Sequence, residues 1–143
     1  MPKKNELCPD CKSLVATSSI KPLRSSKEIL AYLDHFRDKK QEYLVCLSLD
    51  AGQRLIARRV VTIGLLDTTL AHPREVYAEP LIDRAASIII AHNHPSGVAE
   101  PSQHDITLTQ QLVAAGQLLG IPLQDHIIVT VKAHYSFKAS LLI

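Results

Sequence analysis

Aromatic side chains are scarce in this sequence. The chain has 143 residues, of which 4% are aromatic and none is Trp. Its core must therefore be built from aliphatic side chains, mainly Leu, Ile, Val and Ala. Proteins that bind single-stranded nucleic acid stack the bases on aromatic rings, so this composition disfavours a groove of that kind.

Excess charge, long apolar stretches and cysteine are also limited. The formal net charge of +2 is too small to indicate a nucleic-acid or membrane partner by itself. Apolar runs such as Ile88–Ala91 are far shorter than the roughly 18 residues of a membrane-spanning helix, and no apolar run follows the charged first residues as in a secretory signal. The three Cys cannot all pair, so we expect no disulfide framework and a reducing, cytoplasmic compartment.

What remains is an ordinary globular composition, with 46% hydrophobic and 21% charged residues. The length favours one compact domain. We predict an irregular leader over 1–24 and the domain over 25–143. The leader contains Cys8-Pro-Asp-Cys11. One such pair supplies two of the four ligands that a structural zinc normally needs, so a flexible leader is favoured over half of a zinc site completed by another subunit.

Helix signals begin at the start of this domain. Ser25 and Glu28 form a capping box, and apolar residues at helical spacing then predict a helix over about 26–38. A second helix is predicted to begin at His72-Pro73, because Pro suits the first turn. Pro80 lies inside this second pattern and predicts a kink or a break into two short helices.

Strand signals alternate with these helices. The runs over 43–49 and 54–63 flank a turn and predict an antiparallel hairpin. A third helix is predicted from the Ser102 and Asp105 pair to Gly120. The remaining predicted segments are a loop at 67–69 and strands over 87–91, 127–131 and 135–137. This alternation predicts an α/β or α+β sandwich.

Two histidines and an aspartate suggest a metal site. His92 and His94 stand two apart where the strand over 87–91 ends, and a period of two places both imidazoles on one face. Asp105 follows eleven residues later, and the Pro and Gly residues between can fold the chain back. Two imidazoles and one carboxylate suit Zn²⁺, and three protein ligands leave the fourth position to water, which is the catalytic pattern.

Hydrolysis at such a site also needs a proton acceptor and an oxyanion donor. Ser102 lies three residues before Asp105, and its hydroxyl can serve as the donor, as the N-cap of the next helix, or as both. Sequence spacing alone does not choose the acceptor among the candidate carboxylates Glu42, Glu75, Glu79 and Glu100.

The combined pattern resembles a known family. His92-x-His94, then seven residues, then Ser102-x-x-Asp105 is similar to the motif of the JAB/MPN+ (JAMM) metalloproteases, and the surrounding His-Asn-His-Pro-Ser-Gly stretch resembles their RadC-like branch. The resemblance covers about residues 26–137. Further matching pieces are Gly64, His72-Pro-Arg-Glu75, Asp125-His126-Ile-Ile-Val129 and Tyr135-Ser136-Phe137.

The resemblance implies a cytidine-deaminase-like fold, with three α/β/α layers around a small mixed sheet. It implies one Zn²⁺ per chain, with a bound water, held by His92, His94 and Asp105. It also implies that Glu42 is the general base and that Ser102 is the oxyanion donor. The expected reaction is hydrolysis of a peptide or isopeptide bond in a peptide or protein substrate. Deaminases of related fold carry Pro-Cys-x-x-Cys after the His pair, and this chain does not.

Two other functions stay open. One is a metal-dependent protein that acts on or binds nucleic acid in DNA repair, with a weak DNA association. The other is a non-catalytic, zinc-stabilised interaction module, against which the complete set including Glu42 argues. The resemblance to longer RadC-like proteins implies a helix-hairpin-helix module joined to a domain of this kind. We expect no room for that module before residue 26.

Several residues outside the motif have two interpretations. Asp125 or His126 either orients a ligand imidazole or forms a buried hydrogen-bonded pair. A basic cluster on the second strand is expected to be a solvated face, with a phosphate-contacting patch as the alternative. That cluster consists of Arg54, Arg58 and Arg59. We expect His35, His104 and His134 at the surface, and Cys46 in the core.

Overall fold

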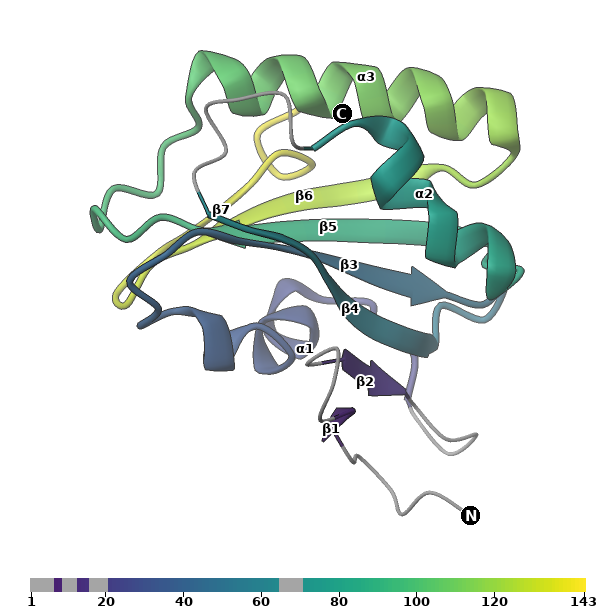
Figure 1. Ribbon diagram of the computed structural model, residues 1–143, viewed down its shortest axis with the longest axis horizontal. Coiled ribbons are helices and arrows are strands. Elements are labelled where there is room, and N and C mark those ends of the chain that lie inside the picture. The colour runs from purple at the N-terminus through teal and green to yellow at the C-terminus, as the bar shows by residue number, and fades with distance from the viewer. Residues whose placement is uncertain (1–6, 9–12, 16–20, 65–70) are drawn as a thin grey trace.

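One mixed β-sheet forms the centre of the molecule (Figure 1). The computed structural model describes residues 7–8, 13–15, 21–64 and 71–143. The strand order is β1-β2-β4-β3-β5-β6-β7. Neighbouring strands are antiparallel except β5 and β6, which are parallel and are joined through α3. The strands are β1 Leu7–Cys8, β2 Ser13–Val15, β3 Tyr43–Leu49, β4 Leu55–Ile63, β5 Ser87–Asn93, β6 Leu123–Val129 and β7 His134–Ser136. The helices are α1 Ser26–Ala31, the 3₁₀ helix η1 Asp34–Phe36, α2 Pro73–Ile82 and α3 Gln103–Leu119.

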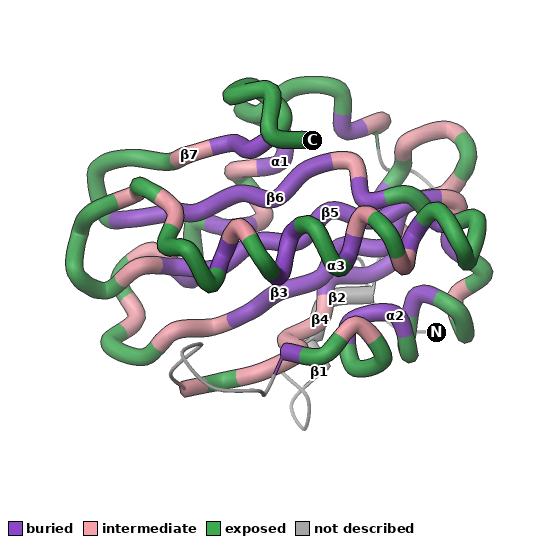
Figure 2. The backbone as a smooth tube through the Cα atoms, turned by 90° about the horizontal axis from the view of Figure 1, so that it is seen from above, coloured by how far each residue is buried: buried purple, intermediate pink, exposed green. Residues whose placement is uncertain are grey.

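Helices cover both faces of the sheet, so the fold is the expected three-layer α/β/α arrangement. In Figure 1, α1 lies below the sheet, and α2 and α3 lie above it. Each face has its own aliphatic core. The α1 face is packed with Leu33, Val45, Leu47, Ile89, Ile127 and their neighbours. The opposite face is packed with Leu44, Ile88, Ile90, Leu108, Leu112 and their neighbours. Figure 2 shows the central strands β3, β5 and β6 mostly buried, whereas α3 alternates between buried and exposed residues.

Local signals in the sequence set several element boundaries as predicted. Strands β3 and β4 form the predicted antiparallel hairpin. Both capping boxes are present, at the N-cap residues Ser25 and Ser102. Gly120 ends α3 with a φ of 72°, a left-handed conformation that glycine adopts without steric cost.

Two helix predictions need correction. The helix predicted over 26–38 ends at Ala31, and the chain tightens into η1, whose short spacing buries Leu33 and Phe36 against the sheet. Pro80 does not divide α2 into two short helices: the helix continues through it to Ile82, and the missing N–H removes one backbone hydrogen bond within the last turn. No helix in the described part of the chain is long and apolar enough to cross a bilayer.

Two core strands are longer than predicted. Strand β5 extends through His92 and Asn93, and β6 begins at Leu123 rather than at residue 127. Polar residues therefore lie inside buried strands. They are tolerated because each finds partners: Asp125, for example, accepts hydrogen bonds from Ser136 Oγ at 2.6 Å and from the backbone N–H of Lys138 at 3.0 Å.

The N-terminal segment contributes two short strands to the sheet. Although 1–24 was predicted to be irregular, β1 pairs with β2, and β2 pairs with β4 at Arg58 and Ala57. Pairing with an edge strand is a tertiary contact that the local pattern of this segment does not reveal. Cys11 and the predicted loop at 67–69 lie outside the described residues, so the Cys-x-x-Cys pair stays a prediction.

The prediction that the arginine cluster forms a solvated face is wrong for Arg58, which is buried. Its Nη1 donates to the carbonyl of Tyr32 at 2.8 Å, and its guanidinium lies over the Phe36 ring. Arg59 points the other way and is paired with Asp83. Successive strand residues face opposite sides, so these arginines do not form one basic surface. The other expectations hold: His35, His104 and His134 are exposed, and Cys46 is buried.

Candidate metal centre

The candidate site lies where strand β5 ends. Ile88 and Ile90 belong to the core under α3, and His92 continues this alternation on the same face. Asn93 therefore faces the α1 side. Strand periodicity thus directs one polar side chain of β5 to each side of the sheet.

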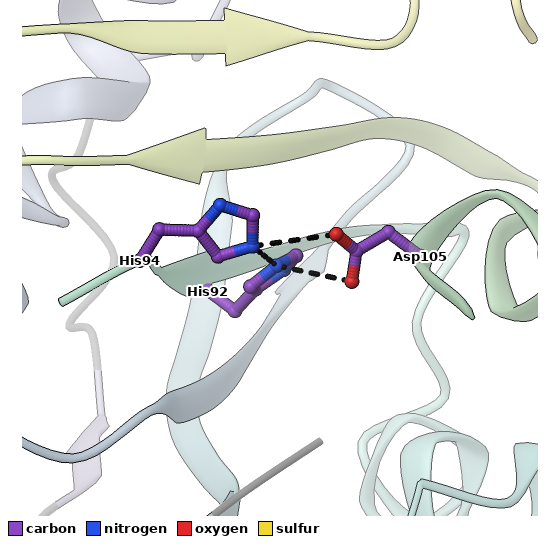
Figure 3. Close-up of side chains that lie close together, drawn as sticks. All are labelled: His92, His94 and Asp105. Atoms are coloured by element: carbon purple, nitrogen blue, oxygen red, sulfur yellow. Dashed lines mark hydrogen bonds and ion pairs between the residues drawn. The ribbon is translucent and has the colours of Figure 1, made fainter. Parts of the chain in front are cut away.

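The structure brings the two predicted histidines and the predicted aspartate together (Figure 3). His92 Nε2 lies 2.8 Å from His94 Nε2. Each of these nitrogens lies 3.3 Å from one carboxylate oxygen of Asp105. Among the residues that the structure describes, these form the one group of three or more His, Cys, Asp and Glu side chains close enough to share an ion.

The hydrogen bonds around Asp105 and His94 hold them in this arrangement. Ser102, the N-cap of α3, accepts a hydrogen bond from the Asp105 N–H at 3.1 Å, and its own N–H donates to Asp105 Oδ2 at 2.8 Å. The capping box that begins the helix therefore also fixes the carboxylate. His94 Nδ1 lies 2.8 Å from the carbonyl of Val98 and must donate to it, which leaves Nε2 to face the site.

Electrostatics favour a cation at this point. Burial opposes ionisation of Asp105, but the contacts of its carboxylate with His92 and His94 outweigh it and hold the pKa of the carboxyl well below its usual range. The pKa of His94 is raised, first by its hydrogen bond to Asp105, and also by the charges of Asp105 and Glu42. The site thus keeps a buried anion and attracts positive charge to the nitrogen opposite it.

Glu42 lies directly before β3, close enough for its charge to act on His94. Its carbonyl accepts a hydrogen bond from the Gly64 N–H at 2.9 Å. The segment around it is held by Asn93, which accepts from the Tyr43 N–H at 2.7 Å and donates to the Gln41 carbonyl at 2.9 Å. Asn93 also donates to the Lys39 carbonyl at 3.3 Å. The sequence analysis missed this role of Asn93, because the contact joins segments 50 residues apart.

Ser102 is exposed beside the buried Asp105. Its hydroxyl oxygen accepts the helix N–H, which leaves the hydroxyl proton available to donate elsewhere. The N-cap interpretation of Ser102 is therefore confirmed, and it is compatible with the predicted donor role. Of the other candidate carboxylates, Glu75 and Glu79 lie on α2, beside a different cavity of about 380 Å³, and Glu100 is exposed in the loop before α3.

His126 lies behind His92, on β6. Its Nε2 is 2.8 Å from His92 Nδ1, and its ring stacks on Phe137 at 4.6 Å between centroids. Burial, followed by the charge of His92, lowers the pKa of His126 well below its usual value. Asp125 instead holds the C-terminal segment and contacts no ligand imidazole in this arrangement. Of the two residues considered from the sequence, His126 is the one beside a candidate ligand.

The three side chains fit a divalent ion by their chemistry and spacing. Ligand atoms about 2.0–2.1 Å from a tetrahedral Zn²⁺ lie roughly 3.3 Å from one another. Each nitrogen lies 3.3 Å from a different oxygen of the Asp105 carboxylate, and one ligand atom from each residue lies within 4.8 Å of the others. The two nitrogens, 2.8 Å apart, would have to separate by about half an ångström to hold such an ion. Two imidazoles and one carboxylate form a mixed nitrogen and oxygen set that Zn²⁺ accepts.

The fold and this site define an α/β domain of the JAB/MPN class, with a cluster of residues that could hold a metal ion. A family model described as "RadC-like JAB domain" matches residues 23–142. The chain therefore belongs to the RadC-like JAB domain family.

Relatives with similar sequences come from archaea and bacteria and are named UPF0758 proteins. The chain is 52% identical to one from Methanospirillum hungatei over 92 residues, which cover 64% of this chain and 41% of the relative. It is 39% identical to one from Methanococcoides burtonii over 117 residues, 81% of this chain and 51% of the relative. It is 44% identical to one from Bacillus cereus over 117 residues, 81% of this chain and 52% of the relative. The chain thus spans about half the length of these relatives, or less, and their names state no activity.

Proposed function

We propose that this domain is a zinc-dependent hydrolase of the JAMM type that cleaves peptide or isopeptide bonds. The observation that carries the proposal is the convergence of His92 Nε2, His94 Nε2 and the Asp105 carboxylate within 3.3 Å of one another, beside Glu42. The RadC-like JAB family membership supports the same assignment.

His92, His94 and Asp105 would hold the ion. When bound, Zn²⁺ would supply a Lewis acid that polarises a carbonyl group and lowers the pKa of a water molecule. Asp105 is ionised before an ion binds, because its pKa lies well below the usual carboxyl range. The carboxylate therefore adds negative charge to the ligand set without first having to lose a proton.

Glu42 and Ser102 would move and stabilise charge during the reaction. Glu42 takes a proton from the attacking water and later gives it to the leaving amine, which is the work of a general base and then a general acid. The Ser102 hydroxyl donates a hydrogen bond to the oxygen that becomes negative, while its lone pair stays engaged with the Asp105 N–H at 3.1 Å. The reaction adds water across the amide bond and needs no other reactant.

The test compares wild type, Glu42→Gln and His92→Ala in one cleavage screen of peptide and isopeptide-linked substrates, with metal analysis of each protein. We expect about one zinc per chain in wild type and in Glu42→Gln, and none in His92→Ala. Cleavage should occur in wild type alone. Unchanged turnover in Glu42→Gln would contradict its role, and zinc retained in His92→Ala would contradict the ligand set.

The same screen includes single- and double-stranded DNA, because DNA repair was the main alternative. Arg58 and Arg59 face opposite sides of the sheet and each has a protein partner, so they offer no phosphate-contacting patch. DNA cleavage that depends on Glu42 would replace the protein substrate in this proposal. We also propose a cytoplasmic location, on the ground of the low cysteine content.

A further inference from the structure

A chain of buried polar atoms leads away from the candidate metal centre through His92. His92 Nδ1 lies 2.8 Å from His126 Nε2, and His126 Nδ1 lies 2.6 Å from Thr109 Oγ1. Thr109 Oγ1 in turn lies 2.7 Å from the carbonyl oxygen of Asp105. These residues are at most 2% exposed. The chain thus begins at one candidate ligand and ends on the backbone of another.

The chemistry of the last atom sets the direction of every hydrogen bond in this chain. A carbonyl oxygen can only accept, so the single hydroxyl hydrogen of Thr109 points to the Asp105 carbonyl. Thr109 Oγ1 must then accept the contact at 2.6 Å, which makes His126 Nδ1 the donor. A neutral imidazole carries one N–H, so His126 Nε2 is the acceptor on the other side of the ring. His92 Nδ1 must therefore donate to it.

His126 is neutral in this arrangement because its surroundings disfavour a charge. The ring is 0% exposed and is stacked face to face on Phe137, with an angle of 8° between the planes. A second N–H on this ring would point at His92, and burial of an imidazolium there is costly. The donor and the acceptor of each hydrogen bond are therefore determined step by step, from Thr109 to His92.

We propose that Thr109 and His126 are positioning residues that hold His92 in its Nδ1–H tautomer, so that the Nε2 lone pair faces His94 and Asp105. In the opposite tautomer, His92 would point an N–H into the site and could not bind an ion there. This inference rests on the proposed function. It assigns a role to Thr109, which the sequence did not single out, and it decides between the two interpretations that the sequence left open for His126.

Parallel pairing of β5 and β6 makes this contact possible. Ile90 is in register with His126, and His92 with Ile128, so His126 lies two residues before the register partner of His92 and on the same face. Thr109 reaches His126 from the second turn of α3, the helix that also carries Asp105. One helix therefore supplies a ligand carboxylate and also controls the tautomer of a ligand imidazole. Partners that hold a metal-ligating His by its other nitrogen commonly affect metal affinity.

The first test needs no metal. Nitrogen NMR of the imidazole rings in metal-free wild type distinguishes the two neutral tautomers. We expect Nδ1–H for both His92 and His126. Finding His126 as the Nε2–H tautomer, or finding it protonated at neutral pH, would overturn the inference.

The second test uses zinc alone as the probe and a matched pair of variants. Thr109→Val keeps the shape of the side chain but removes the hydroxyl, whereas Thr109→Ser keeps the hydroxyl. We expect Thr109→Val to bind zinc roughly 10- to 100-fold more weakly than wild type and to show altered His92 and His126 ring signals. We expect Thr109→Ser to resemble wild type in both measurements.

Equal zinc affinity of the folded Thr109→Val and Thr109→Ser proteins would overturn the inference. If Thr109→Val does not fold, the ring signals of wild type and Thr109→Ser decide it. If wild type binds no zinc, the proposed function fails, and the NMR result still determines whether Thr109 and His126 set the tautomer.

Discussion

Replacing Asn93 should destabilise the protein, because Asn93 joins the end of β5 to the segment before β3 that carries Glu42. Asn93→Ala removes an acceptor 2.7 Å from the Tyr43 N–H and donors 2.9 Å and 3.3 Å from the carbonyls of Gln41 and Lys39. The side chain is 0% exposed, so water does not readily replace it. At about 1 kcal/mol for each hydrogen bond, with a further contribution from the cavity, we expect the free energy of unfolding to fall by roughly 2–4 kcal/mol.

Urea unfolding measures this loss, and hydrogen exchange shows whether it is local. The Tyr43 amide should exchange faster in Asn93→Ala than in wild type, because its acceptor is gone. Ser96→Ala, an exposed change in the following loop, is the control and should stay within about 0.5 kcal/mol of wild type. A loss below about 1 kcal/mol in Asn93→Ala, with normal exchange at Tyr43, would refute the view that Asn93 holds this segment.

Asn93→Asp tests whether the donors of the Asn93 amide are needed as well as its acceptor. The new carboxylate keeps an acceptor for the Tyr43 N–H, but it places an oxygen against the carbonyls of Gln41 and Lys39. We expect it to be at least as destabilising as Asn93→Ala at pH 7, and less so in acid, where protonation restores one donor. A variant as stable as wild type at pH 7 would show that those carbonyls do not depend on the Asn amide.

Three further predictions concern the site and the core. In the metal-free protein, the lowered pKa of Asp105 gives stability that is present above the usual pKa of 3.8 and is lost as the pH falls toward the pKa of the folded state. The raised pKa of His94 gives stability that is present below pH 6.5 and is lost as the pH rises through the pKa of the folded state. The stability difference between wild type and Asp105→Asn should therefore be largest between those two pH values in urea unfolding with chelator, and a difference independent of pH would contradict the pairing. Zinc at about 100 times its Kd should raise the free energy of unfolding by about 2.7 kcal/mol, and the Tm by roughly 5–11 °C, in wild type but not in His92→Ala. Gly116→Ala should destabilise the protein by about 1–3 kcal/mol, because a Cβ there would lie 2.6 Å from a backbone carbonyl oxygen. Gly52→Ala is the control and should have little effect, because a Cβ at Gly52 would meet only the end of a flexible Arg side chain. A stabilised Gly116→Ala protein would show that α3 can shift outward.

Local sequence signals were sufficient for the elements that depend on local chemistry. Hydrogen bonds within a few residues create the capping boxes at Ser25 and Ser102, and the left-handed Gly120 ends α3 without reference to the rest of the fold. The hairpin of β3 and β4 is local in the same sense. Elements that depend on distant partners were predicted less well. Strand β6 continues through Asp125 because Ser136 and Lys138, more than ten residues away, satisfy its carboxylate.

The candidate site shows the same division between local and distant information. His92 and His94 share a face by strand periodicity, and Asp105 is fixed by its own helix cap, so the pattern of residue types was enough to group them. Glu42 could be chosen among the carboxylates only through the family resemblance, because its place depends on the pairing of β3 with β5.

The residues around the ligands require the tertiary structure. Whether His126 faces His92 is decided by the register of the parallel strands β5 and β6, and a shift of one residue would turn its ring to the α1 face. The connection from Thr109 to His92 then follows from atoms on three separate elements. A motif can therefore name the side chains that meet an ion, whereas the protonation of those side chains is set by strand register. That is why the tautomer experiment examines a property of the fold that the motif does not contain.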